Sequence, residues 1–251
     1  WISTANAVEY TGAKTVFADV DISTFNINFE NILKKINSKT KAIIVVHLFG
    51  LCVDVMKLKT KIPKNIKIFE DCACAVGASF DGISSGNLGE LGVFSFHPRK
   101  IITTGEGGML TTNNFKIAKK IMEMRNHGAT INDFDRHKRV NPSQMADFNL
   151  LGYNYRMTDL QAAIGIEQLK KINRILKTRE NLAKYYIENL KNLNWLSLPN
   201  LSKESKHSLQ AFVVTVNNSN SKLKRNKIMQ ILQDKGISTR PGTHAVHMLS
   251  Y

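Results

Sequence analysis

The sequence predicts an α/β fold in which helices cover both faces of a mostly parallel sheet. Short runs that are apolar throughout alternate with segments of helical period along residues 14–126. Strands of this kind, separated by helices, are typical of parallel sheets buried on both sides. The 251 residues are 43% hydrophobic and 22% charged, which excludes a disordered or collagen-like chain and allows a large core with a smaller unit beside it.

Each element is expected from its own local pattern. The predicted strands are residues 14–20, 41–49, 66–70, 92–96 and 108–112, and the predicted helices of the same part are residues 29–36, 55–60 and 115–126. Thr158 and Asp159 then begin a long helical pattern over residues 160–176, and a second one follows over residues 179–193.

The pattern changes in the last fifth of the chain. Residues 209–216 are expected to form a strand and residues 222–233 a helix that Gly236 ends. We therefore predict a large domain over residues 1–175, followed over residues 176–251 by a linker helix and the beginning of a small α/β domain.

The chain is strongly basic, with 35 Lys and Arg residues against 20 Asp and Glu residues and a formal net charge of +15. The basic clusters alternate with Ile, Leu and Asn at helical spacing, which indicates solvated outer faces; a phosphate-binding surface is the alternative. The sequence contains no pattern of a recognition helix, zinc finger or aromatic stacking sheet, so we expect no nucleic acid partner.

The sequence gives no sign of a membrane protein or of secretion. No apolar run reaches the roughly 20 residues that span a bilayer, and no basic region precedes an apolar core at the N-terminus. Three cysteines are too few for a disulfide framework in a chain of this length, so a cytoplasmic location is expected. The chain begins at Trp1 without an initiator Met, and we expect it to be a fragment of a longer protein.

The densest chemical pattern surrounds Lys100. This lysine follows the strand predicted over residues 92–96 and precedes a glycine-rich turn, residues 105–108. A lysine in a loop beside glycines can approach a planar ligand closely, and a desolvated lysine can form a Schiff base with an aldehyde cofactor. The alternative is an ordinary exposed lysine in a turn.

Asp71 strengthens the catalytic interpretation. It stands at the carboxyl end of the buried strand over residues 66–70, and ligands of open α/β sheets bind at such ends. A lysine-bound pyridine cofactor needs an acidic side chain at its ring nitrogen. Asp71 and Lys100 are 29 positions apart, about one helix and strand, so both can reach one edge of the sheet. A helix N-cap is the alternative role for Asp71.

Longer segments resemble a known family. The resemblance is carried by WISTANAVEYTGAKTVFADVD, VVHLFG, EDCACAVGA, SFHPRKIITTGEGGML and LGYNYRMTDLQAAIGIEQL, and more weakly by GISTRPGTHAVH. These resemble, in order, successive signatures of the DegT/StrS sugar aminotransferases, which are enzymes of fold type I that depend on pyridoxal phosphate (PLP). The resemblance implies that aspartate-aminotransferase-like fold, PLP as cofactor, and transfer of an amino group from glutamate to a nucleotide-linked keto-deoxysugar in polysaccharide or glycan biosynthesis.

The resemblance also implies roles for individual residues. Lys100 corresponds to the lysine that forms the internal aldimine and carries the proton, and Asp71 to the partner of the pyridinium nitrogen. Trp1 occupies the position of an aromatic ring stacked on the cofactor, and Ser95 that of a hydroxyl bound to its phosphate. Asn154 corresponds to a residue that reaches the phosphate of the neighbouring subunit's cofactor, which implies a homodimer with shared active sites.

Two departures from the family pattern stand out. Cys74 occupies the position where the family has Gln or His in contact with the ring oxygen, and a thiol is a weak donor. The Gly/Thr/Ala segment that grips the phosphate from the N-terminal side is absent from the sequence. Three further residues lie where the family contacts the nucleotide sugar, with a polar surface loop as the alternative: Arg240, His244 and His247.

Several other residues leave alternatives open. His97 is expected either to pack or to contact a ligand, and His47 to end a strand near the mouth of the pocket. Arg156 could bind substrate or form an interface ion pair. Cys52, Cys72 and Cys74 lack a fourth cysteine or a spaced pair of histidines, so we expect no metal site.

Two other functions are alternatives to a transaminase. A sugar-dehydratase branch of the same family has His at the lysine position, so Lys100 argues against it. A non-catalytic regulatory or anion-binding protein on the same fold would differ in forming no imine at Lys100.

Overall fold

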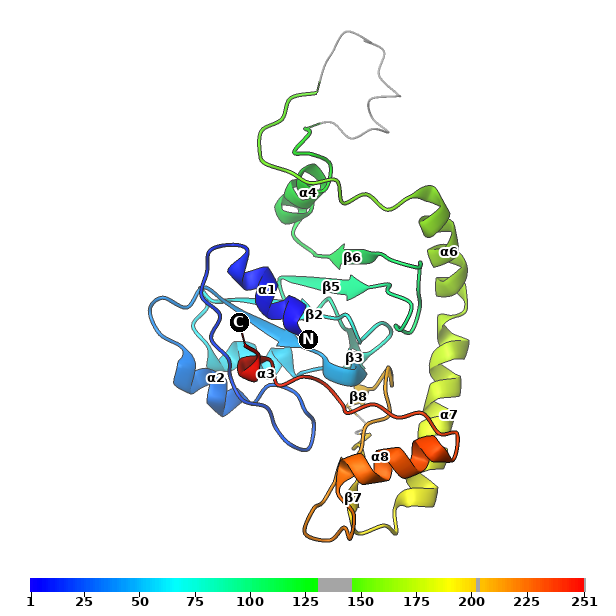
Figure 1. Cartoon of the computed structure of the whole chain (residues 1–251). Coiled ribbons are helices and arrows are strands. Elements are labelled where there is room, and N and C mark those ends of the chain that lie inside the picture. Colours follow the sequence, from blue (N-terminus) through cyan, green and yellow to red (C-terminus); the bar gives the residue numbers. More distant parts are fainter. Residues whose placement is uncertain (131–145, 202–203, 251) are drawn as a thin grey trace.

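The centre of the molecule is a four-stranded sheet (Figure 1). The computed structural model describes residues 1–130, 146–201 and 204–250. The strands of the sheet are β1 (Ala42–Val46), β2 (Lys67–Asp71), β5 (Leu91–Ser95) and β6 (Gly108–Thr111), in the spatial order β1-β2-β5-β6. β1, β2 and β5 are parallel and β6 is antiparallel to β5, so the predicted mostly parallel sheet is confirmed.

Successive side chains of β1 and β2 point alternately to the two faces of the sheet. Ile43, Val45 and Ile68 are buried against α2 (Phe29–Lys35) and α3 (Val55–Lys61), whose first turns are capped by Asn28 and Asp54. The residues between them point to the opposite face, in front of which α1 (Ile2–Glu9) lies in Figure 1.

A second group of elements follows the sheet. α4 (Phe115–Met124) comes directly after β6, and the long pair α6 (Asp159–Lys170) and α7 (Ile172–Leu190) runs along one side of the sheet. Thr158 and Gln161 form a capping box at the start of α6, so this helix begins where the sequence predicts. Leu176 of α7 packs on Phe96 and Ile102, which anchors the helix to the loop after β5.

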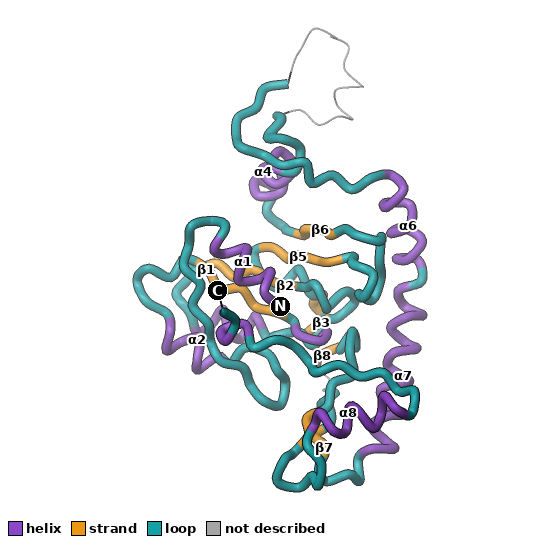
Figure 2. The backbone as a smooth tube through the Cα atoms, in the orientation of Figure 1, coloured by secondary structure: helices purple, strands orange, loops and turns teal. Residues whose placement is uncertain are grey.

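The remaining elements are short. They are β3 (Ser79–Phe80), β4 (Ile83–Ser84) and β8 (Ser205–Lys206) in one small sheet, β7 (Leu196–Ser197) and β9 (Thr215–Val216) in another, α8 (Arg225–Asp234), and the 3-10 turns η1 (Leu48–Gly50) and η2 (Val246–Met248). Gly236 follows α8 with φ +79°, the left-handed conformation expected of a helix stop. Figure 2 shows the chain after α8 as a loop that runs back toward α1.

Three sequence predictions are wrong in detail. Residues 14–20 form no strand: Val20 makes a single bridge to Ile27, and Val16 is 60% exposed. The break between the long helices falls at Lys171, because α6 ends there in a tight turn and α7 starts at once. The strand over residues 209–216 shrinks to Thr215–Val216: Leu209 has φ +54° and the backbone bends at residues 210–211, so the paired segment begins later.

Helix coverage of the sheet is also less complete than predicted. Val93 of β5 is 43% exposed and Met109 of β6 is 50% exposed, so the β6 side of the sheet is open among the described residues. None of the described helices is long and apolar enough to cross a membrane. The division of the chain at residue 175 stays a prediction.

The segment before Leu209 is held by a titratable residue. His207 Nδ1 accepts a hydrogen bond from the backbone N–H of Leu209 at 2.9 Å, and burial lowers the pKa of His207 to about 4. When the pKa of a group is lower in the folded protein than in the unfolded chain, the group stabilises the fold at pH values above its pKa in the unfolded chain. That stabilisation is lost as the pH falls through its pKa in the folded protein.

We predict that the free energy of unfolding decreases as the pH falls from about 6.5 to 4, because protonation of His207 favours the unfolded chain. His207→Asn keeps an acceptor for the Leu209 N–H and removes the titration, so its stability should change less over this range. Urea unfolding at a series of pH values measures this, with His247→Asn, an exposed histidine, as the control. Parallel pH profiles for the wild type and His207→Asn would contradict the assignment.

Candidate active site

The carboxyl ends of the parallel strands bring the predicted site residues together. Asp71 is the last residue of β2, in register with Val46 on one side and Val93 on the other. It therefore stands at the middle of the sheet edge, where open α/β folds bind ligands. Because Glu70 is buried against the opposite face, the half-buried Asp71 side chain points to the face on which α1 lies.

The Asp71 carboxylate is oriented by two hydrogen bonds. Its Oδ2 accepts from the hydroxyl of Thr4 in α1 at 2.7 Å, and its Oδ1 accepts from the backbone N–H of Ala73 at 3.0 Å. Residues 72–78 form successive turns and no helix, so the alternative role of Asp71 as a helix N-cap is wrong. The contact with Thr4 links α1 to the end of β2.

Lys100 reaches the same place from the loop after β5. Its backbone N–H donates to the carbonyl of His97 at 2.9 Å, which closes a turn, and its side chain is half-buried. The ammonium Nζ donates to Cys74 Sγ at 3.4 Å, and Cys74 is three residues beyond Asp71. The structure thus brings Lys100 and the segment that begins at Asp71 into one site.

Ser95 and His97 border this site at the end of β5. Ser95 Oγ accepts from the backbone N–H of His97 at 3.4 Å and is half-buried. His97 Nδ1 accepts from the Arg99 N–H at 3.2 Å, and its Nε2 lies 3.8 Å from Glu106 Oε1 across the glycine-rich turn. His97 therefore helps to hold in place the loop after β5 that carries Lys100.

The C-terminal segment lies against the N-terminal one. The rings of Trp1 and His244 meet edge to face with centroids 5.2 Å apart, and those of Phe17 and His247 are 6.4 Å apart. Trp1 is 62% exposed, and Arg240 is exposed on the same C-terminal segment. The structure thus brings one of the predicted sugar-binding residues, His244, to the predicted ring-stacking residue, Trp1.

Asn154 and Arg156 lie elsewhere. Asn154 is exposed and forms an isolated antiparallel bridge with Asn126, and Arg156 Nη1 donates to the Asn126 side chain at 2.7 Å. Figure 1 shows this segment beyond the β6 edge of the sheet. The rings of Tyr153 and Tyr155 stack beside it at 4.8 Å, and both side chains are exposed.

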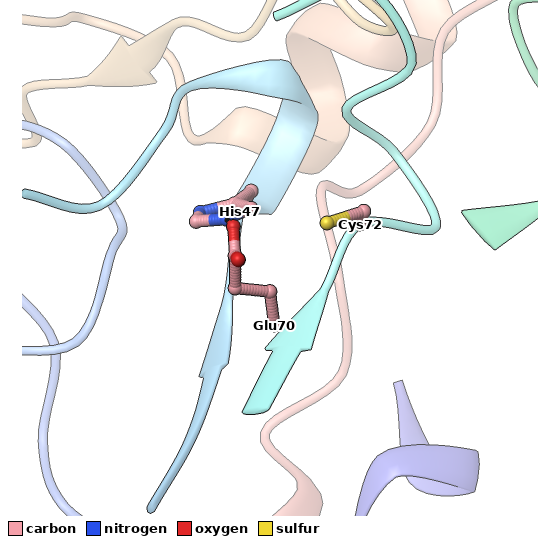
Figure 3. Close-up of side chains that lie close together, drawn as sticks. All are labelled: His47, Glu70 and Cys72. Atoms are coloured by element: carbon pink, nitrogen blue, oxygen red, sulfur yellow. Dashed lines mark hydrogen bonds and ion pairs between the residues drawn. The ribbon is translucent and has the colours of Figure 1, made fainter. Parts of the chain in front are cut away.

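A buried hydrogen-bonded pair that the sequence patterns do not predict lies behind the site. His47 and Glu70 are both fully buried, with His47 Nε2 2.8 Å from Glu70 Oε2 (Figure 3). His47 Nδ1 accepts from the Val53 N–H at 3.0 Å, so the proton of the neutral ring sits on Nε2 and is donated to Glu70. His47 is therefore inside the fold, and its predicted place near the pocket mouth is wrong.

Glu70 accepts more hydrogen bonds than His47 alone can provide. The backbone N–H groups of Gly86, Leu88 and Gly89 donate to its two oxygens at 2.8, 2.8 and 2.6 Å. Burial alone raises the pKa of Glu70, but the hydrogen bonds from His47 and from the Gly89 and Gly86 N–H groups outweigh it and hold that pKa below its ordinary value. A carboxylate directly before Asp71 in an apolar strand was the available sequence signal.

This cluster is not arranged to hold a metal ion. His47, Glu70 and Cys72 place ligand atoms within 4.8 Å of one another, and all three residues are buried. Both ring nitrogens of His47 and all four lone-pair directions of Glu70 are occupied by hydrogen bonds. Burial raises the pKa of the Cys72 thiol far above its ordinary value, so it is a poor ligand.

The fold and the site define an open α/β protein with a lysine and a carboxylate at the carboxyl edge of its sheet. Residues 1–251 match the DegT/DnrJ/EryC1/StrS aminotransferase family, and the chain belongs to this family. The family resemblance of the sequence motifs is thereby confirmed.

Individual relatives agree with this assignment. The chain is 40% identical over 238 residues to an uncharacterized protein of Methanocaldococcus jannaschii, with 94% of this chain and 61% of the relative covered. It is 36% identical over 251 residues to the GDP-perosamine synthase of Caulobacter vibrioides, with 99% and 64% covered. The chain thus spans less than two thirds of the length of these curated relatives.

A solved structure gives the same fold. PseC of Helicobacter pylori, an aminotransferase involved in the biosynthesis of pseudoaminic acid, superposes with a TM-score of 0.89 at 27% identity. The superposition covers 100% of this chain and 65% of that protein. The predicted fold class, that of the PLP-dependent sugar aminotransferases, is confirmed.

We predict that Glu70→Gln lowers the free energy of unfolding by about 2–4 kcal/mol, because the amide would turn an NH2 group toward backbone N–H donors in a buried site. Glu90→Gln is the matched control: its carboxylate forms an exposed pair with Lys67 at 3.4 Å, so its loss should cost about 1 kcal/mol or less. Urea unfolding at neutral pH gives both values. Equal losses in the two variants would show that the buried hydrogen bonds contribute little.

Proposed function

We propose that the protein is a PLP-dependent transaminase, or the part of one that carries its lysine. The amino group would pass from an amino acid, glutamate, to a keto-deoxysugar linked to a nucleotide, as a step in polysaccharide or glycan biosynthesis. Family membership and the GDP-perosamine synthase relatives support the class of reaction and of substrate. The observation that carries the proposal is the contact of Lys100 with Cys74, which closes one site between the lysine loop and the segment that starts at Asp71.

The side chains of this site fit PLP. A planar aldehyde with a phosphate and a ring nitrogen needs an amine, an anionic acceptor and hydroxyl donors, and the site provides Lys100, Asp71 and Ser95. The pyridine ring of the cofactor, kept protonated, would supply an electron sink for the Cα carbon of the amino donor. Trp1 would offer its ring face from the segment that also contacts His244.

Lys100 is suited to act as nucleophile and proton carrier. Its Nζ is held by the thiol of Cys74, and it forms no ion pair with a carboxylate among the described residues. The flexible lysine chain can carry a proton between two nearby carbon atoms. Asp71 would accept a hydrogen bond from the protonated ring nitrogen while Thr4 and Ala73 hold its carboxylate in place.

Four further residues are assigned to the nucleotide sugar and to a second subunit. Arg240, His244 and His247 would bind the nucleotide diphosphate from the C-terminal segment, with cations and ring N–H groups for its oxygens. Asn154 would reach the phosphate site of a second subunit in a homodimer, because it is exposed and belongs to a segment beyond the β6 edge. The cytoplasm is the proposed location.

The first prediction concerns cofactor attachment. The full-length protein incubated with PLP should develop a visible absorption band that glutamate removes and 2-oxoglutarate restores. Lys100→Ala should lack the band, because the amine that joins the cofactor is gone, and Lys64→Ala, an exposed lysine, should retain it. A folded wild-type protein without any band would contradict the assignment of Lys100.

The second prediction separates Asp71 from Lys100. Asp71→Asn should keep the visible band, because Lys100 is intact, but glutamate should remove it roughly 100-fold or more slowly, since the ring nitrogen loses its anionic partner. Stopped-flow absorbance measures the rate. Asp81→Asn, which alters an aspartate in the turn between β3 and β4, is the control and should react like the wild type. If glutamate removed the band of Asp71→Asn at a rate within about threefold of the wild-type rate, Asp71 would not be the partner of the ring nitrogen.

A further inference from the structure

The three cysteines lie in two different environments. Cys52 and Cys72 are buried, and burial raises the pKa of the Cys52 thiol to about 12 and that of Cys72 well above its ordinary range. Such thiols stay protonated and shielded from solvent, so they react slowly with oxidants. Cys74 is half-buried, and its sulfur is 3.4 Å from the Lys100 amine.

The backbone around both residues is held in place. The Cys74 carbonyl accepts a hydrogen bond from the buried Ser208 hydroxyl at 3.2 Å, and the turn at Ala75 is closed by its N–H to the Cys72 carbonyl at 2.9 Å. Lys100 is fixed by its own backbone bond to His97. The sulfur and the nitrogen are therefore kept as neighbours, and side-chain rotation alone can bring them to bonding distance.

We propose that Cys74 and Lys100 form a reversible redox switch, in which hydrogen peroxide leads to a covalent sulfur–nitrogen bond between them. Peroxide transfers one oxygen to the Cys74 sulfur, its O–O bond breaks, and water leaves, so that the thiol becomes a sulfenic acid. The Lys100 nitrogen lone pair then attacks the sulfur, the S–O bond breaks, and the hydroxyl leaves as water with a proton from the nitrogen. Sulfur is oxidised, peroxide is reduced, and the protein loses two hydrogen atoms in total.

Thiols reverse the reaction. One small thiol attacks the sulfur of the S–N bond, the Lys100 amine departs with the thiol's proton, and a mixed disulfide remains on Cys74. A second thiol then releases Cys74 and leaves as the small disulfide. This regulatory consequence rests on the proposed function: the bond consumes the amine that would join PLP, so oxidation would prevent cofactor loading and bound cofactor would protect the pair.

The test treats the cofactor-free, full-length protein with a small excess of hydrogen peroxide, blocks remaining thiols, and maps the peptides by mass spectrometry. We expect the peptides that contain Cys74 and Lys100 to be joined, with two hydrogen atoms fewer than their sum, and to separate again with dithiothreitol. Cys52 and Cys72 should stay reduced. Cys74→Ser and Lys100→Arg should both abolish the joined peptide, and Lys100→Arg should leave a sulfenic acid on Cys74 that dimedone labels.

A second measurement tests the contact itself. Ortho-phthalaldehyde joins an amine and a thiol that lie side by side into a fluorescent isoindole, and the wild type should form one that Cys74→Ser and Lys100→Arg lack. Three results would each overturn the proposal. They are absence of the isoindole in the folded wild type, oxidation of Cys74 without a bond to Lys100, and a disulfide between Cys74 and Cys72.

Failure of the switch and failure of the proposed function give different results. A joined peptide in a protein that shows no visible band with PLP would support the redox switch and contradict the transaminase assignment. If the protein shows a normal visible band with PLP but peroxide never joins the two peptides, only the redox switch is contradicted.

Discussion

The Glu70 carboxylate is the group on which the arrangement of the site depends. It is fully buried and accepts hydrogen bonds from His47 and from three backbone N–H groups of the loop over residues 86–89. Burying a carboxylate is costly unless its oxygens are satisfied, and here the donors come from two elements other than its own strand. The charge therefore specifies how β1, β2 and that loop fit together.

The consequence for the site follows from strand geometry. Glu70 and Asp71 are consecutive and point to opposite faces of the sheet, so fixing Glu70 on one face fixes the direction of Asp71 on the other. The His47 backbone N–H donates to the Asp71 carbonyl at 3.1 Å, which adds a second restraint at the same point. Thr4 then orients the carboxylate from the other side, and the turns that follow carry Cys74 to Lys100.

Local patterns in the sequence predicted the elements that depend on local physics. The apolar runs of β1, β2 and β5 and the starts of α3 and α6 are in the right places, because burial and helix initiation depend on nearby residues. The position of Asp71 at a strand end could be predicted for the same reason. Its proximity to Lys100 followed from connection length and from the resemblance to a family, and the contact through Cys74 supports it.

What the sequence did not predict depends on partners that are distant along the chain. Residues 14–20 have the composition of a strand but no neighbouring strand to pair with in the described structure, and the antiparallel direction of β6 leaves no mark in its apolar pattern. The His47–Glu70 pair joins residues 23 positions apart, and the other hydrogen bonds to the buried carboxylate come from backbone N–H groups, which nearly every residue type carries.

Lys100 is the residue proposed to join PLP, and chemical trapping tests this central assignment most directly. Borohydride reduction of the full-length protein with PLP fixes the cofactor to whichever amine holds it, and peptide mapping then identifies the residue. Stoichiometric label on the peptide that contains Lys100, with only traces on the many exposed lysines, is the predicted result. Label spread over surface lysines, or concentrated on a lysine other than Lys100, would contradict the account.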